Sequence, residues 1–216
     1  EGKLIQSLKE NGYIQNAREA VLRAASRTDK GVSSLGNVLA FNTENNIDEF
    51  ILECNDSLQS ILIYGKKIVD ETFYPRYANQ RIYAYYLKKD LIDLQVLHTV
   101  VPLFIGTYNF SNFARVESHK DPMRTIDDIS IIETESFYVL KFQAQTFLWH
   151  QIRRIVSAIL QVQRQKITKD DIMKALHYPE EEIDFGLAPS FPLILEDIIY
   201  NFNFELDKDA LKKKEE

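Results

Sequence analysis

An arginine, a threonine and an aspartate stand directly before a lysine–glycine pair near the start of the chain. The segment reads ASRTDKGVSSLGNVLAF over residues 25–41. Asp29 can hydrogen-bond its own backbone and Gly31 can take a positive φ, so the segment predicts a tight loop that leads into the apolar strand Val38–Phe41. Asp29, with Arg27 beside it, is a candidate functional carboxylate. The alternative is an ordinary Asx turn beside a solvated arginine. The five residues Arg27–Gly31 alone identify no function.

A second candidate lies on a long amphipathic helix expected over Phe147–Lys166. At about 100° per residue, its apolar side chains form one broad arc that includes Trp149. Arg153 falls at the margin of this arc, where a half-buried guanidinium needs a carboxylate or phosphate partner. Arg154 falls in the middle of the polar face, with His150, and we expect it to be solvated.

A third candidate is a tyrosine-rich strand that follows a proline turn in FYPRYANQRIYAYYL, residues 73–87. Period-two alternation from Arg81 places Tyr83, Tyr85 and Leu87 on the same face as this arginine. Such a stripe is either core packing or a functional surface. The polar and aromatic loop Gly106–Arg115 has the same two interpretations, because it either packs its own phenylalanines or presents them to a ligand.

Composition limits the number of domains and the class of protein. The chain has 216 residues, of which 45% are hydrophobic and 12% aromatic, enough for one large or two small cored domains. No apolar run has membrane-spanning length, and the single cysteine, Cys54, fits a reducing compartment, so we expect a cytoplasmic protein. The net charge of −6 does not exclude a local cationic cleft. Metal binding is not supported, because the four histidines are far apart: His98, His119, His150 and His177.

The remaining elements mix helices and strands. We expect helices at residues 1–10, 47–58 and 168–177, the last with a capping box from Thr168. A hairpin of 125–133 with 137–145 and an edge strand after Gly186 complete the pattern. A boundary near residue 95 would divide the chain into an N-terminal half (1–95), a C-terminal half (96–204) and a charged tail (205–216).

Five stretches in order resemble one family, the TruA-type tRNA pseudouridine synthases. They are spread along the chain from residue 26 to residue 200, and five matches at family spacing are far more specific than any one of them. They are SRTDKGV (26–32), FYPRYANQRIYAY (73–85), GTYNFSNF (106–113), FLWHQIRRIV (147–156) and GLAPSFPLILEDIIY (186–200).

The resemblance implies roles for particular residues. The family's catalytic aspartate falls on Asp29, preceded by the family arginine at Arg27. The motif tyrosine falls on Tyr83, and the arginine that pairs with the aspartate falls on Arg153. Arg76 matches a basic residue of the RNA cleft. Further RNA contacts are expected from scattered basic residues and should weaken with salt: Arg81, Lys66, Lys67 and Lys120.

The reaction that the resemblance implies explains these residue types. Converting uridine to pseudouridine breaks the N-glycosidic bond, rotates the base and rejoins it through C5. Asp29 would act as a nucleophile on the ribose or as a base on it, and the sequence does not distinguish these. Arg153 would keep the carboxylate charged, and Tyr83 could stack on the base and help to remove the C5 proton. No metal or organic cofactor is required.

The family likeness also implies a fold and partners. The fold would be α+β, with two similar halves whose mainly antiparallel sheets join across a central RNA-binding cleft. The substrate would be tRNA, at uridines on the 3′ side of the anticodon stem-loop, and a homodimer is expected. The family normally has a strand ahead of the helix that begins here at Glu1. Either the sequence is a trimmed version, or it lacks this strand and leaves a sheet edge unpaired.

Two other functions compete with the enzyme. A non-catalytic tRNA-binding protein could use the same scaffold, and the missing first strand is the best argument for it. The presence of Asp29, Tyr83 and Arg153 together favours the enzyme. A hydrolase that uses Asp29 with a second acid lacks any companion carboxylate motif.

Overall fold

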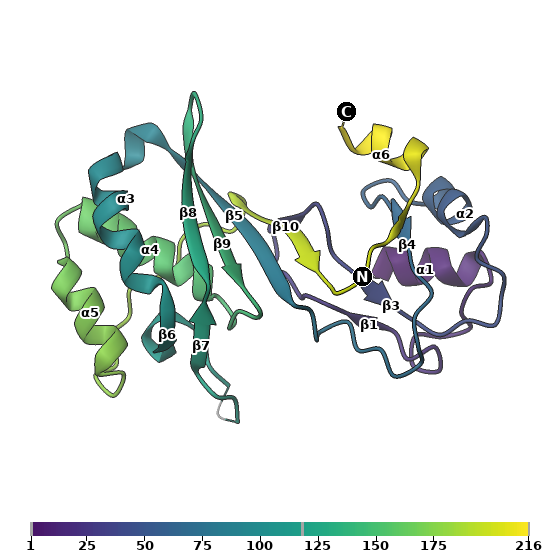
Figure 1. Ribbon diagram of the computed structural model, residues 1–216, viewed down its shortest axis with the longest axis horizontal. Helices are drawn as coiled ribbons and strands as arrows, with labels where there is room; N and C mark the ends of the chain where they lie inside the picture. The colour runs from purple at the N-terminus through teal and green to yellow at the C-terminus, as the bar shows by residue number, and fades with distance from the viewer. Residues whose placement is uncertain (1, 118, 216) are drawn as a thin grey trace. The chain divides into compact units, whose positions relative to one another are not determined.

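The largest sheet of the computed structural model, which describes residues 2–117 and 119–215, contains five strands. They lie in the order β2–β10–β5–β9–β8, and only the pair of β2 and β10 is parallel (Figure 1). With the surrounding helices they form a mixed α+β fold, as predicted. The strands are β2 (Ser33–Ser34), β5 (Gln80–Lys88), β8 (Asp128–Glu133), β9 (Phe137–Ala144) and β10 (Leu193–Ile199).

The centre of this sheet is β5, the predicted tyrosine strand. It pairs with β9 on one side and with β10 on the other, so its backbone groups are satisfied along most of its length. Tyr83, Tyr85 and Leu87 share one face and are 7%, 2% and 2% exposed. Tyr85 and Leu87 are therefore packed in the core, and Tyr83 keeps a small accessible area. Because β10 lies between β2 and β5, the prediction of an edge strand after Gly186 was wrong.

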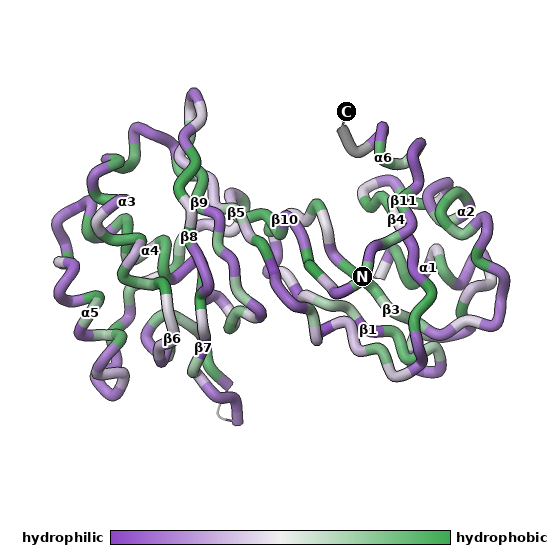
Figure 2. Tube along the Cα trace, in the orientation of Figure 1, coloured by the Kyte–Doolittle hydropathy of each residue, from purple (hydrophilic) through white to green (hydrophobic). Residues whose placement is uncertain are grey.

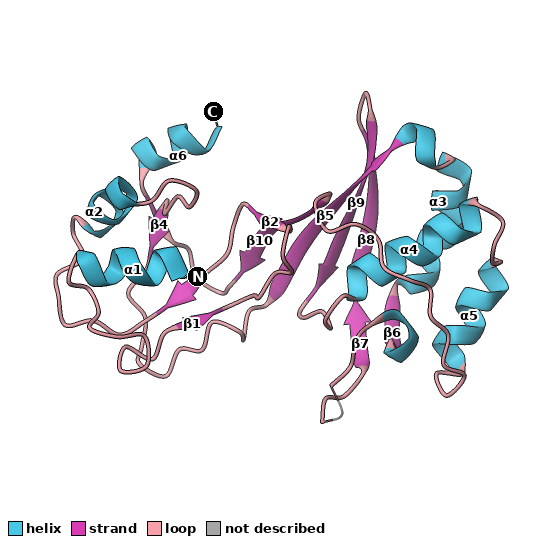
Figure 3. Ribbon diagram, turned by 180° about the vertical axis from the view of Figure 1, so that it is seen from behind, coloured by secondary structure: helices cyan, strands magenta, loops and turns pink. Residues whose placement is uncertain are grey.

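Helices α3 (Leu94–Val100), α4 (Gln151–Gln163) and α5 (Lys169–His177) lie together on one face of the sheet (Figures 1 and 3). Hydrophobic and hydrophilic residues alternate along α4 (Figure 2), as its sequence pattern predicted. The predicted capping box of α5 is present, with Thr168 and Asp171 bonded reciprocally. Short 3₁₀ turns cover residues 89–91, 101–104 and 111–113.

The start of α4 differs from the prediction. The helix begins at Gln151, four residues later than expected, because His150 takes a left-handed conformation with φ of 65°. A non-glycine residue seldom adopts this conformation, although histidine tolerates it better than most. Leu148 and Trp149 therefore stand outside the helix, and the helical projection does not apply to them.

The loop Gly106–Arg115 packs its own phenylalanines. Strand β6 (Gly106–Asn109) pairs with β7 (Met123–Ile126), so the first residues of the predicted hairpin belong to a separate ladder. Phe110 and Phe113 are fully buried. The packing interpretation of this loop is confirmed.

The chain divides into two compact units that interleave along the sequence. Unit 1 contains Glu1–Ser26, Val38–Tyr77 and Tyr200–Glu216, and unit 2 contains Arg27–Asn37 and Ala78–Ile199. The boundary expected near residue 95 falls inside unit 2, because β5 pairs with strands from the later part of the chain.

Unit 1 packs its helices around a small core that includes Leu8, Phe50 and Cys54. Cys54 is a free thiol buried in this core. The elements of unit 1 are α1 (Gly2–Glu10), α2 (Phe50–Ser57), α6 (Lys208–Glu215), the pair β1 (Arg23–Ala24) with β3 (Leu39–Ala40), and the pair β4 (Gly65–Lys66) with β11 (Glu205–Leu206).

A return segment, residues 184–192, carries the chain of unit 2 from α5 back to β10. Phe185 anchors it: its ring stacks on Phe113 with centroids 4.7 Å apart and planes 8° apart. The carbonyl of Phe185 accepts hydrogen bonds of 2.6 Å from both Ser157 and Gln161 of α4. The polar face of α4 is therefore a docking surface for this segment.

Replacing Phe185 by alanine should destabilise the protein, because a side chain that is 1% exposed would leave a cavity against Phe113. We expect the free energy of unfolding to fall by about 3–5 kcal/mol in urea titrations followed by circular dichroism. Phe191→Ala is the matched control, since Phe191 is 76% exposed on the same segment, and it should change stability by less than about 0.5 kcal/mol. Equal effects of the two variants would contradict the anchoring role of Phe185.

Candidate active site

The Asp29 loop lies against the return segment within unit 2. The backbone N–H of Val32 donates to the carbonyl of Asp29 at 3.1 Å, which closes the predicted turn. Gly31 has φ of 89°, and a Cβ at this position would lie 2.7 Å from Oγ of Ser190. Only glycine suits both the backbone and the space, so the loop that carries Asp29 stays close to residue 190.

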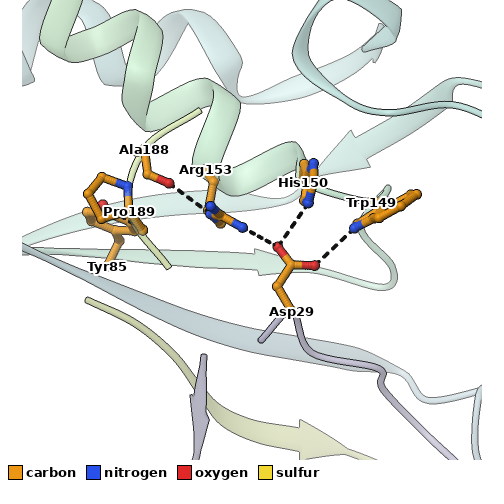
Figure 4. A network of polar contacts seen from close by, with 7 residues as sticks. All are labelled: Asp29, Tyr85, Trp149, His150, Arg153, Ala188 and Pro189. Carbon is orange, nitrogen blue, oxygen red and sulfur yellow. Dashed lines mark hydrogen bonds and ion pairs between the residues drawn. The ribbon is translucent and has the colours of Figure 1, made fainter. Parts of the chain in front are cut away.

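Arg153 is the cationic partner of Asp29. Its NH1 group donates to Oδ2 of Asp29 at 2.6 Å, and its Nε donates to the carbonyl of Ala188 at 2.8 Å (Figure 4). The side chain of Arg153 is 12% exposed and that of Asp29 is 19% exposed. The backbone N–H of Ala188 returns a bond of 3.2 Å to the carbonyl of Arg153. The anion that the helical projection required for Arg153 is therefore Asp29.

Trp149 and His150 also contact Asp29, and the sequence analysis missed both. The indole Nε1 of Trp149 donates to Oδ1 of Asp29 at 3.0 Å, and Nε2 of His150 lies 3.4 Å from Oδ2 (Figure 4). Periodicity had assigned Trp149 to the apolar arc and His150 to the polar face. The helix starts only after the left-handed residue His150, so both residues lie outside it and their side chains turn to Asp29. No periodic pattern could signal this.

The environment of His150 lowers its pKa. Burial is the largest cause, and the positive charges of Arg153, Arg154 and Arg115 act in the same direction, while Asp29 opposes them. His150 is therefore mainly uncharged at neutral pH, and Arg153 is the group that supplies positive charge to the carboxylate.

Arg154 is not solvated, so that prediction was wrong. Its NH1 group pairs with Oδ1 of Asp184 at 2.8 Å, and its side chain is 23% exposed. The same oxygen accepts the backbone N–H of Gly186 at 2.9 Å. This backbone bond, with a smaller contribution from Arg154, lowers the pKa of Asp184. A helical projection cannot show the return segment that covers this face of α4.

The tyrosines of β5 occupy different surroundings. The ring of Tyr83 meets Phe147 edge-on, with centroids 5.5 Å apart. The hydroxyl of Tyr85 donates to the carbonyl of Pro189 at 3.0 Å, and burial raises the pKa of Tyr85 to about 12. Tyr85 thus fixes the return segment beside Arg153, as Figure 4 shows.

The predicted RNA-binding residues are not equally accessible. Arg27 and Arg76 are exposed, Arg27 in unit 2 and Arg76 in unit 1. Arg81 is 4% exposed and donates to the carbonyl of Gln145, so its predicted RNA contact gains no support. Lys67 is exposed, Lys66 donates to the carbonyls of Ile47 and Asp48, and Lys120 pairs with Glu117.

No group of three or more His, Cys, Asp or Glu side chains among the described residues could hold a metal ion. None of the helices in residues 2–117 and 119–215 is long and apolar enough to cross a membrane.

The lowered pKa of His150 predicts how the free energy of unfolding changes at acidic pH. As the pH falls through about 6.5, unfolded chains take up a proton at this histidine before folded ones do, so folding loses free energy there. His150→Asn removes this titration and tolerates the left-handed backbone. Between pH 7 and pH 5, the free energy of unfolding should fall less in His150→Asn than in the unsubstituted protein, as measured by urea titration. Parallel slopes would contradict the direction of the shift.

Comparison with known proteins shows the family of this chain. A family model described as tRNA pseudouridine synthase matches residues 100–201. The chain is 38% identical to tRNA pseudouridine synthase A of Thermococcus sibiricus, over 99% of this chain and 80% of that relative. It is 35% identical to the protein of the same name from Pyrococcus furiosus, over 99% of this chain and 79% of that relative. For the Methanothermobacter thermautotrophicus relative, these values are 33%, 97% and 75%.

These relatives extend the similarity beyond the five motifs to nearly every residue of the chain. The identities and the coverage confirm the resemblance found in the sequence. This chain belongs to the tRNA pseudouridine synthase A, or TruA, family.

Proposed function

We propose that this protein is a tRNA pseudouridine synthase in which Asp29 is the reacting carboxylate. Its relatives carry that name, and the observation that best supports it here is the 2.6 Å ion pair between Asp29 and Arg153. The two residues are 124 positions apart in sequence. An ordinary surface Asx turn has no need of an arginine that is itself mostly buried.

The reaction is an isomerisation of uridine, so no atoms are gained or lost overall. The bond between N1 of the base and C1′ of the ribose breaks, the base rotates, and C1′ bonds to C5. The proton on C5 then leaves, and N1 takes up a proton. Asp29 would start the reaction by attacking C1′ as a nucleophile or by removing a proton from the ribose. In the first case the Asp29–C1′ bond breaks when C5 bonds to C1′, and in the second Asp29 returns the proton to the ribose.

Arg153 would hold Asp29 ready for either step. Because its Nε is bonded to the carbonyl of Ala188, the guanidinium stays fixed and does not reorient when a substrate arrives. A preorganised cation of this kind stabilises charge on the carboxylate at little reorganisation cost.

We propose that Tyr83 stacks on the target base and assists removal of the C5 proton. The target would be a uridine on the 3′ side of the anticodon stem-loop, turned out of its helical stack. Arg27 and Arg76, both exposed, are the proposed phosphate contacts. The family's central RNA cleft, a homodimer and a cytoplasmic location remain predictions.

A non-catalytic tRNA-binding protein is the second candidate. It needs a cationic surface but no carboxylate held by three side chains. The contacts of Asp29 with Arg153, Trp149 and His150 therefore favour the enzyme.

Asp29→Asn should abolish pseudouridine formation on unmodified tRNA transcripts, because an amide is neither a nucleophile nor a base here. We expect the rate to fall by about 10³-fold or more, with mapped positions lost together and tRNA binding retained. Asp70→Asn is the control, since Asp70 is an exposed aspartate of unit 1 bonded to Thr72. Retained activity in Asp29→Asn would remove the catalytic role, and an inactive but tRNA-binding unsubstituted chain would favour the second candidate.

Tyr83→Phe should separate stacking from proton removal. The phenyl ring keeps the edge contact with Phe147 and loses only the hydroxyl. We expect the single-turnover rate to fall about 10²–10⁴-fold while the Kd for tRNA changes less than about twofold. A variant with full activity would show that the hydroxyl takes no part in the reaction.

A further inference from the structure

The two oxygens of the Asp29 carboxylate have unequal partners. Oδ2 faces two nitrogen-bearing side chains, Arg153 at 2.6 Å and His150 at 3.4 Å. Oδ1 accepts a hydrogen bond of 3.0 Å from the neutral indole N–H of Trp149. A carboxylate oxygen with a strong charge-assisted bond holds its electrons more tightly than one bonded to a neutral donor. Oδ1 is therefore the more reactive oxygen.

Accessibility distinguishes the same two sides of the carboxylate. The side chains that hold Oδ2 are 12% exposed for Arg153 and 17% exposed for His150. Trp149, which holds Oδ1, is 45% exposed. A substrate can therefore approach the carboxylate on its Trp149 side more easily than through Arg153.

Arg115 holds Trp149 in place twice. Its guanidinium carbon lies 4.4 Å from the centre of the indole ring, a cation–π contact. Its backbone N–H donates to the carbonyl of Trp149 at 2.8 Å. Arg115 is itself placed by Phe113 and Ala114, which are buried.

We propose that Trp149 is a positioning residue for the isomerisation, that it holds Oδ1 of Asp29 toward the substrate, and that Oδ1 is the oxygen that reacts. Arg115 supports the indole through its cation–π contact and its backbone hydrogen bond. This inference rests on the proposed function of Asp29. It holds for both chemistries of Asp29, because the same oxygen would form the bond to C1′ or accept the ribose proton.

The indole N–H can be removed at this one position by replacing tryptophan with an analogue, because Trp149 is the only tryptophan of the chain. Production in a tryptophan auxotroph supplied with β-(3-benzothienyl)alanine replaces this one N–H by sulfur and keeps the shape of the ring. Single-turnover rate, Kd for unmodified tRNA transcript and melting temperature are then measured for both forms. We expect a rate about 10–100-fold lower, as for loss of a hydrogen bond to a charged group, with Kd within twofold and an unchanged melting temperature.

Two substitutions supplement this experiment. Trp149→Phe lacks the N–H and should show the same loss of rate. Arg115→Met keeps a long side chain without the charge, and its rate should fall roughly two- to fivefold. Lys169→Met is the control for loss of an exposed cation elsewhere in unit 2, and it should leave the rate unchanged.

An unchanged rate in the benzothienyl form would overturn the inference, because the N–H would then have no role in positioning Oδ1 of Asp29. Weaker tRNA binding with an unchanged rate would also overturn it, because Trp149 would then contact RNA without positioning Asp29. Failure of the proposed function appears differently, as an unsubstituted chain without activity or an Asp29→Asn variant that retains it.

Discussion

The bridge that Arg153 makes between Asp29 and the carbonyl of Ala188 is the interaction on which the rest of unit 2 depends. A mostly buried guanidinium is tolerated only when its hydrogen bonds and its charge are satisfied together. One side chain thus joins the Asp29 loop, helix α4 and the return segment. Loss of any of the three would leave a buried charge without a partner, so the site and the fold of this unit are stabilised by the same contacts.

Helix α4 contributes to both the fold and the site because it makes contacts on two of its faces. Its apolar face packs in the core, where Ile155 and Ile159 are fully buried. Its polar face binds the return segment through Arg154, Ser157 and Gln161. The segment is therefore not a free loop. Its backbone supplies fixed acceptors that orient Arg153, which suits a site whose geometry must exist before the substrate binds.

The sequence predicted the parts of this arrangement that depend on local pattern. The alternation of β5 and the marginal position of Arg153 follow from periodicity, and the capping box of α5 follows from the residue types at its start. The structure confirms all three. The pairing of Arg153 with Asp29 came from family resemblance, because no pattern within one helix names a partner on another segment. Trp149 and His150 were missed because the left-handed residue His150 delays the start of the helix to Gln151. Arg154 was misjudged because a return segment far along the chain covers it.

The separation of these residues along the chain has a consequence for biosynthesis. Asp29 precedes Arg153 by 124 positions, and Arg153 precedes Ala188 by 35. At about 5–20 residues per second, the ribosome makes Asp29 roughly 6–25 s before its arginine exists. During that interval the Asp29 loop lacks both Arg153 and the return segment that packs against Gly31. A nascent chain that stops before residue 188 therefore cannot contain the assembled site, and the proposed reaction at Asp29 can begin only after most of the protein has been synthesised.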